Sequence, residues 1–161
     1  LESDNNHFQL TSDEFFKSLR SSKILSSDIC FDVIFIDGLH LAEQVERDIK
    51  NSLDFIKDDG FILLHDCNPP SEFHARETYD YEYTPAKSAW NGTVWKSFAK
   101  LRMKNIGLDL ICVDCDWGVG IIRKKPSSIF ALSESLDYNF LDNNRNELLN
   151  LISVSDFINK F

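Results

Sequence analysis

Two short segments of the sequence carry side chains that can do acid–base or metal chemistry. Asp37-Gly38-Leu39-His40 follows one apolar run, and His65-Asp66-Cys67-Asn68 follows another. If the two runs are neighbouring parallel strands, about 4.8 Å apart, the carboxylates of Asp37 and Asp66 can close on a single cation. Oxygen ligands of this kind favour a hard ion such as Mg²⁺. An imidazole beside them titrates near neutral pH and can accept a proton.

Each of these residues also has an ordinary structural role. An aspartate at the end of a strand often caps the next helix, which applies to Asp37. A single histidine such as His65 often only hydrogen-bonds to the backbone, and His40 also fits a surface position in the first turn of a helix. The same chemistry at the ends of both strands is what favours a functional pair.

Near-continuous apolar runs precede both segments. Residues 31–37 and 61–66 are rich in β-branched and aromatic side chains, as expected for strands buried on both faces of a parallel sheet. Between them, apolar residues recur at helical spacing: Leu41, Val45, Ile49, Leu53 and Ile56. Residues 58–60, Asp-Asp-Gly, are expected to end this helix. A strand, a helix and a strand form a βαβ unit, and ligands collect at the carboxyl ends of such strands.

The rest of the chain supplies further elements. Residues 67–89 have no periodicity and contain several prolines and tyrosines, which is typical of a lid or a binding loop. A helix is expected over residues 90–104, capped by Asn91-Gly92-Thr93. Residues 108–123 are expected to fold as an antiparallel hairpin. Residues 148–152 are expected in a short helix of a C-terminal docking segment.

Composition places limits on function. The chain has 161 residues, 43% of them hydrophobic and 27% charged, which describes one soluble globular domain. A formal net charge of -9, from 26 Asp and Glu against 17 Lys and Arg, argues against a nucleic-acid partner. Without a long apolar run or the features of a signal peptide, we expect no membrane partner and a cytoplasmic location. The four cysteines are expected to be reduced, with Cys112 and Cys115 on opposite faces of a strand.

Three runs of the sequence resemble a known family. Residues 31–40, 59–66 and 90–95 are similar to class I S-adenosylmethionine-dependent methyltransferases, and most similar to the small-molecule and sugar O-methyltransferases whose fourth and fifth strands end in D-G-x-H and H-D. The resemblance covers residues 11–123. It implies an α/β fold with a Rossmann-like methyltransferase sheet, in which the later strands are parallel and a C-terminal hairpin is antiparallel. Residues 1–125 would be the C-terminal part of that domain, and residues 126–161 a helical tail docking on it.

The resemblance implies a reaction and a set of acid–base and metal residues. The reaction would be methyl transfer from S-adenosylmethionine to a hydroxyl of a small molecule or sugar, assisted by a divalent cation in the members that use one. Asp37, Asp66 and Asn68 would ligate the metal, although Cys67 stands where metal-dependent relatives often carry an acid or amide. His40 falls at the position of their general base.

The same resemblance implies contacts with the cofactor and the acceptor. Ser12 and Asp13 lie in a segment that commonly contacts the adenine, and with Asp37 they would bind S-adenosylmethionine. His65 and Trp90 would contact the acceptor.

The family's glycine-rich loop after its first strand has no counterpart in this sequence. At about 30 residues per βα unit, we expect some 60 residues of the family domain to precede Leu1, which makes this an incomplete domain. In such a sheet the strand at residues 31–37 would have an uncovered edge. We therefore expect that edge to pair with a second copy of the chain in a homodimer.

Three functions remain open at the level of sequence. The first is the catalytic and acceptor-side part of an O-methyltransferase. The second is a metal enzyme of another class, with iron or another transition metal held by His40, His65 and Asp66. The third is a non-catalytic interaction module that keeps the fold.

Overall fold

The computed structural model of the chain describes residues 8–81, 83–104, 107–126 and 135–160. The chain divides into two compact units, Leu1–Cys30 and Phe31–Phe161. The first unit contains α1 (Ser12–Arg20), which begins with a capping box. The Glu14 backbone N–H donates to the Thr11 hydroxyl, and the Glu14 carboxylate accepts from the Thr11 backbone N–H.

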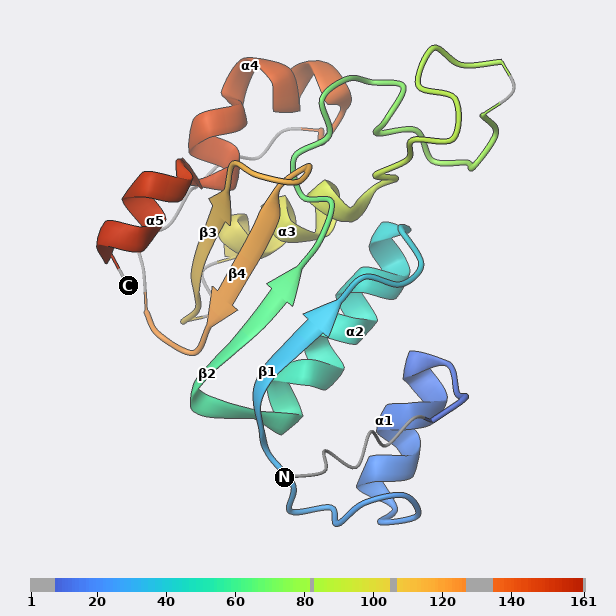
Figure 1. The fold of residues 1–161 in the computed structure, drawn as a ribbon, viewed down its shortest axis with the longest axis vertical. Helices are drawn as coiled ribbons and strands as arrows, with labels where there is room; N and C mark the ends of the chain where they lie inside the picture. The colour runs from blue at the N-terminus through green and yellow to red at the C-terminus, as the bar shows by residue number, and fades with distance from the viewer. Residues whose placement is uncertain (1–7, 82, 105–106, 127–134, 161) are drawn as a thin grey trace. The chain divides into compact units, whose positions relative to one another are not determined.

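A five-stranded mixed sheet forms the centre of the second unit, in the order β1-β2-β4-β3-β5 (Figure 1). Its strands are β1 (Phe31–Ile36), β2 (Ile56–Leu64), β3 (Asp109–Val113), β4 (Val119–Arg123) and β5 (Leu151–Ile152). Its helices are α2 (Ala42–Phe55), α3 (Val94–Lys104), α4 (Tyr138–Leu149) and α5 (Val154–Lys160). In the described part of the chain, no helix is both long and apolar enough to cross a membrane.

The predicted βαβ unit and hairpin are both present. β1 and β2 pair in parallel and are joined by α2. β4 is antiparallel to both β3 and β2. The α/β class of the fold, with parallel strands followed by an antiparallel hairpin, is therefore confirmed.

Several element boundaries differ from the sequence-based expectation. α2 ends at Phe55, and β2 already begins at Ile56. The expectation that residues 58–60 end the helix is therefore wrong. Residues 57–60 instead form an irregularity in the β1–β2 register, between the pairs Phe31–Ile56 and Val33–Phe61. The predicted helix over residues 148–152 is wrong in its second half, because β5 forms there and pairs in parallel with β3.

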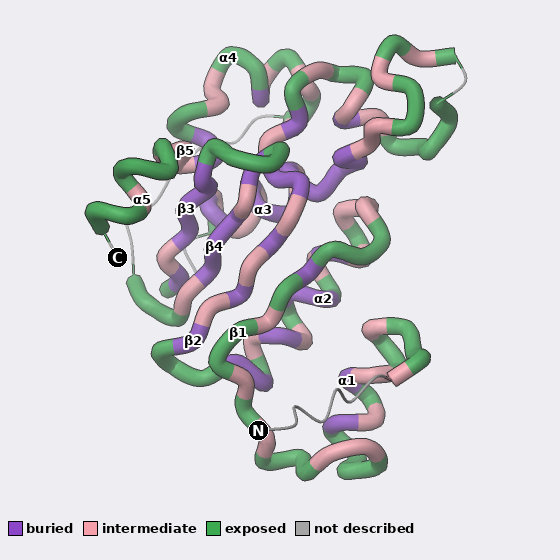
Figure 2. The backbone as a smooth tube through the Cα atoms, in the orientation of Figure 1, coloured by how far each residue is buried: buried purple, intermediate pink, exposed green. Residues whose placement is uncertain are grey.

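Buried and partly buried residues alternate along the second half of β2 (Figure 2). Ile62 and Leu64 of β2 are buried in the main cluster, together with residues of α2, α3 and α4. Phe61 and Leu63 face the other side, where Phe157 of α5 packs with buried residues of β3 and β4. β1 is less covered than β2, and its Val33 and Phe35 side chains are exposed.

The register brings the two chemical segments to the same edge of the sheet. Ile36, the last residue of β1, pairs with Leu64, the last residue of β2. The next backbone amide, that of His65, donates to the Ile36 carbonyl at 3.1 Å. The segments that contain Asp37 and Asp66 therefore leave the sheet side by side.

Candidate active site

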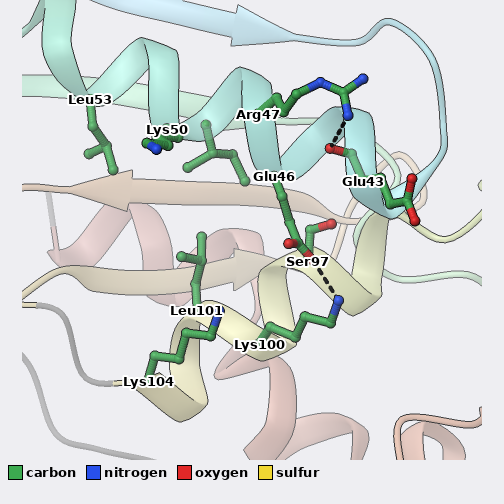
Figure 3. A pocket seen from close by; sticks show the side chains of 10 residues that line it. Glu43, Glu46, Arg47, Lys50, Leu53, Ser97, Lys100, Leu101 and Lys104 are labelled. Carbon is green, nitrogen blue, oxygen red and sulfur yellow. Dashed lines mark hydrogen bonds and ion pairs between the residues drawn. The ribbon is translucent and has the colours of Figure 1, made fainter.

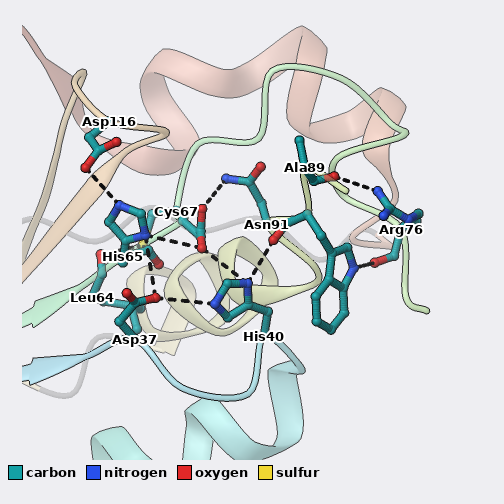
Figure 4. Close-up of polar contacts among 11 residues, drawn as sticks. Asp37, His40, Leu64, His65, Cys67, Arg76, Ala89, Asn91 and Asp116 are labelled. Carbon is teal, nitrogen blue, oxygen red and sulfur yellow. Dashed lines mark hydrogen bonds and ion pairs between the residues drawn. The ribbon is translucent and has the colours of Figure 1, made fainter. Parts of the chain in front are cut away.

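A cluster of carboxylates and imidazoles lies at the carboxyl ends of β1 and β2 (Figure 4). His40 Nε2 lies 3.3 Å from Asp37 Oδ1, and His40 Nδ1 lies 3.2 Å from Asp66 Oδ2. Asp37, His40 and Asp66 each offer one ligand atom, and these atoms all lie within 4.8 Å of one another. The predicted convergence of these three side chains is present in the structure.

Asp66 is the most buried member of the cluster. It is 1% exposed, and its backbone has a left-handed φ of 63°. Burial raises the pKa of its carboxyl group, while the neighbouring charges of His40 and His65 act in the opposite direction. The strained backbone and the burial together indicate that this carboxylate is held in place by its surroundings.

His65 lies between three carboxylates. Its Nδ1 is 3.3 Å from Asp66 Oδ2 and 3.6 Å from Asp37 Oδ1, and its Nε2 is 3.2 Å from Asp116 Oδ2. Burial alone would lower the pKa of His65, but the hydrogen bond to Asp116 and the charges of Asp66 and Asp37 outweigh it and raise that pKa. Its cationic form partly balances the negative charge of the cluster.

Residues 90–93 close one side of the site. His40 Nδ1 donates to the Trp90 carbonyl at 2.8 Å, and the two rings stack with centroids 5.3 Å apart. Asn91 Nδ2 donates to Asp66 Oδ1 at 2.7 Å. The Thr93 backbone N–H donates to the His40 carbonyl, and the Thr93 hydroxyl accepts from the Ala42 N–H at 2.8 Å. We expected this segment to cap its own helix, but the Thr93 hydroxyl instead caps the first turn of α2.

In the described residues of the segment 67–89, no helix or strand forms, as predicted, and Arg76 holds this segment together. The Arg76 guanidinium donates to the carbonyls of Phe73, Lys87 and Ala89. The Arg76 carbonyl accepts from Trp90 Nε1 at 2.8 Å. The Tyr79 ring lies against Trp90, with centroids 5.3 Å apart. These contacts fix the indole that covers His40.

Asn68 is not brought into the cluster. Its Nδ2 donates to Asp114 Oδ1 at 3.1 Å, and its Oδ1 accepts from Arg145 Nη1 at 2.5 Å. Ser12 and Asp13 lie at the start of α1, in the first compact unit, so their part in cofactor binding stays a prediction.

Sequence reasoning missed two members of the site. Asp116 lies in the β3–β4 turn and reaches His65, and Asn91 lies before α3 and reaches Asp66. The Asn91-Gly92 pair was a usable signal, because Gly92 adopts a left-handed φ of 60° directly beside His40. Such a glycine marks a close approach of two backbones.

The second unit also has hollows outside this cluster. A groove of about 570 Å³ runs between α2 and α3 (Figure 3), with Leu53 and Leu101 among its apolar residues and a Lys100–Glu46 ion pair across it. A smaller hollow of about 350 Å³ is lined mainly by polar groups, including Asp114, Asp116 and Arg145. The smaller hollow borders the site, because Asp116 binds His65.

Comparison with known proteins finds a family model that is similar to part of the chain. Residues 2–67 match the family model described as a methyltransferase domain. The matched residues include the ends of both β1 and β2, where Asp37 and Asp66 lie. No curated protein matches the chain.

Similarity to solved structures is more distant. The crystal structure of the SAH-bound methyltransferase PaMTH1 of Podospora anserina is 22% identical, with a TM-score of 0.42. The alignment covers 66% of this chain and 45% of that chain, so this chain spans less than half of that protein. Neither the fold nor the function of this chain is inferred from that similarity.

Proposed function

We propose that the protein transfers a methyl group from S-adenosylmethionine to a hydroxyl group of a small molecule or sugar. The observation that carries the proposal is the placement of His40 between the carboxylates of Asp37 and Asp66. The methyltransferase-domain match over residues 2–67 supports the reaction class. When bound, S-adenosylmethionine supplies a methyl group that is already electrophilic. The protein's remaining task is to orient the acceptor oxygen and remove its proton.

His40 is the proposed general base. The Trp90 carbonyl can only accept a hydrogen bond, so Nδ1 carries the proton of the neutral imidazole. Nε2 is then the basic nitrogen, and it lies 3.3 Å from Asp37 Oδ1. Once Nε2 has accepted a proton from the acceptor hydroxyl, the carboxylates of Asp37 and Asp66 stabilise the imidazolium.

A divalent cation fits the same cluster, with Asp37 and Asp66 as its proposed ligands. Carboxylate oxygens are the donors that Mg²⁺ prefers, and His40 lies within 4.8 Å of both carboxylates. When bound, such a cation lowers the pKa of a hydroxyl that it contacts. Asn68 can join the ligands only if its bonds to Asp114 and Arg145 break.

The cofactor and acceptor contacts remain proposals. We assign Ser12, Asp13 and Asp37 to cofactor binding. Trp90 and His65 lie on either side of the His40–Asp37 pair, which supports their contact with the acceptor. The polar hollow beside Asp116 favours an acceptor with several hydroxyl groups.

The test compares His40→Ala with His74→Ala, a matched histidine variant outside the cluster. Calorimetry measures binding of S-adenosylmethionine, and transfer of a labelled methyl group to a panel of phenols and sugars measures activity. We expect His40→Ala to lose at least about 100-fold in turnover, with cofactor affinity unchanged. Unchanged turnover in His40→Ala would contradict the assignment of His40 as the general base. A wild type that binds no S-adenosylmethionine would contradict the proposed methyl transfer.

A transition-metal enzyme is the second candidate. Nδ1 of His40 and Nδ1 of His65 lie 3.2 and 3.3 Å from the same atom, Asp66 Oδ2, so two imidazoles and a carboxylate converge. The bond from His40 Nδ1 to the Trp90 carbonyl leaves Nε2 as the only nitrogen of His40 that could ligate a metal, because a protonated nitrogen has no lone pair for one. Iron found by elemental analysis of the purified protein would favour this candidate.

A second copy of the chain remains the proposed partner of β1. β1 is an edge strand of the sheet, and Val33 and Phe35 are 53% and 58% exposed. Light scattering after gel filtration should give the mass of a dimer for the wild type and of a monomer for Val33→Lys. A monomeric wild type would contradict this pairing.

A further inference from the structure

We infer that Asn91 is a positioning residue, which orients the Asp66 carboxylate so that a single oxygen faces the site. The inference rests on the proposed function, because it assigns Asn91 a role in the cation site made by Asp37 and Asp66. Asn91 itself contacts neither the acceptor nor the cation in this assignment.

The two oxygens of Asp66 have different partners. Oδ1 accepts from Asn91 Nδ2 at 2.7 Å, and this is a contact between buried groups. Oδ2 faces His40 Nδ1 at 3.2 Å and His65 Nδ1 at 3.3 Å. The amide of Asn91 therefore selects which oxygen is turned toward the base and the cation.

Packing alone does not explain an asparagine at this position. Asn91 is 0% exposed, and its Oδ1 has no hydrogen-bond partner among the described residues. Burying an unpaired amide oxygen is unfavourable, and leucine has the same branched shape without that cost. The amide is thus explained by the one bond that it makes, to Asp66.

The backbone around Asn91 is held independently of its side chain. The N–H groups of Asn91 and Gly92 both donate to the His74 carbonyl at 3.0 Å. The Thr93 hydroxyl accepts from the Ala42 N–H at the start of α2, and the Thr93 N–H donates to the His40 carbonyl. Replacing the Asn91 side chain should therefore leave the segment in place and change only the Asp66 carboxylate.

The experiment measures binding of Mn²⁺ to the 161-residue chain, using calorimetry and the electron paramagnetic resonance spectrum of the bound ion. Asn91→Leu keeps the branched shape and removes the donor, and Asn91→Ala is a second, smaller variant in case the larger leucine side chain prevents folding. Both should bind Mn²⁺ at least about tenfold more weakly and change the spectrum of the bound ion, as expected for loss of a group that orients a ligand.

Two controls separate positioning from stability. Asp137→Ala removes the cap of α4, which lies outside the site, so it should lower the melting temperature while Mn²⁺ affinity stays the same. Ser52→Ala replaces another fully buried polar side chain and should leave Mn²⁺ affinity unchanged. Wild-type Mn²⁺ affinity in both Asn91 variants would overturn the inference alone. A wild type that binds no Mn²⁺ would overturn the cation site and the inference together.

Discussion

Gly92 lies directly against the backbone of His40. A Cβ atom on residue 92 would be 2.0 Å from the His40 carbonyl oxygen and 2.8 Å from the His40 Cβ. The same carbonyl accepts the Thr93 N–H at 2.8 Å. The segment that leads into α3 therefore packs directly against the loop that carries the proposed base, His40.

Gly92→Ala should therefore destabilise the protein. Alanine at a φ of 60° is strained, and its methyl group would overlap the His40 carbonyl. These two effects should lower the free energy of unfolding by at least about 2 kcal/mol, measured by urea denaturation. Gly38→Ala is the control, because no atom lies within 4 Å of the position that its methyl group would take. Equal losses in the two variants would mean that the close approach to His40 is absent.

His74 should make the stability of the protein sensitive to acid. Burial, and then the charge of Arg76, lower the pKa of His74 in the folded state. Neutral His74 therefore contributes fully to the free energy of unfolding above the pKa that it has in the unfolded chain, near 6.5. This contribution is lost as the pH falls toward the lower pKa that His74 has in the folded state. His74→Asn removes this titration and keeps an amide near the Ser71 hydroxyl, which lies 2.7 Å from His74 Nδ1. Urea denaturation at about pH 7.5 and about pH 5.5, on either side of the unfolded pKa, should show a smaller loss in His74→Asn than in the wild type, and equal losses would contradict the prediction.

The sheet edge that carries the site could be predicted because local sequence determines it. The apolar runs that end at Ile36 and Leu64 are long enough to be recognised as buried strands, and parallel pairing places their ends together. The convergence of Asp37, His40 and Asp66 follows from that pairing.

The remaining contacts depend on parts of the chain that have no periodicity. Asn91 reaches Asp66 across a 25-residue separation made mostly of irregular loop, and no spacing rule predicts such a contact. Asn68 is taken out of the cluster by Arg145, a side chain 77 residues later in the sequence. Residues 58–60 were expected to end the helix because the register irregularity that accommodates them within β2 has no sequence signature.

Arg102 should be a major contributor to stability. Its side chain is buried, and it donates to the carbonyls of Leu110, Glu147 and Leu148 at 2.9 to 3.1 Å. Arg102→Met would leave these carbonyls without that donor, and the free energy of unfolding should fall by about 3 kcal/mol. Lys100→Met removes only the ion pair with Glu46, in which both side chains are more than a third exposed, and should cost less than about 1 kcal/mol. Chemical denaturation of both variants measures the difference, and a loss in Arg102→Met no larger than that in Lys100→Met would contradict the role of these three bonds.

The four cysteines should fall into two classes of reactivity. Cys30 and Cys115 are exposed, whereas Cys67 and Cys112 are buried, and all four are free thiols. Burial raises the pKa of both Cys67 and Cys112, so each is inaccessible and also disfavoured as a thiolate. In native buffer, a disulfide reagent should modify Cys30 and Cys115 at least about 100-fold faster than the buried pair, and all four should react in urea. Replacing both exposed cysteines by serine should abolish the fast phase; a fast phase that persists would mean that Cys67 or Cys112 opens to solvent in the native state.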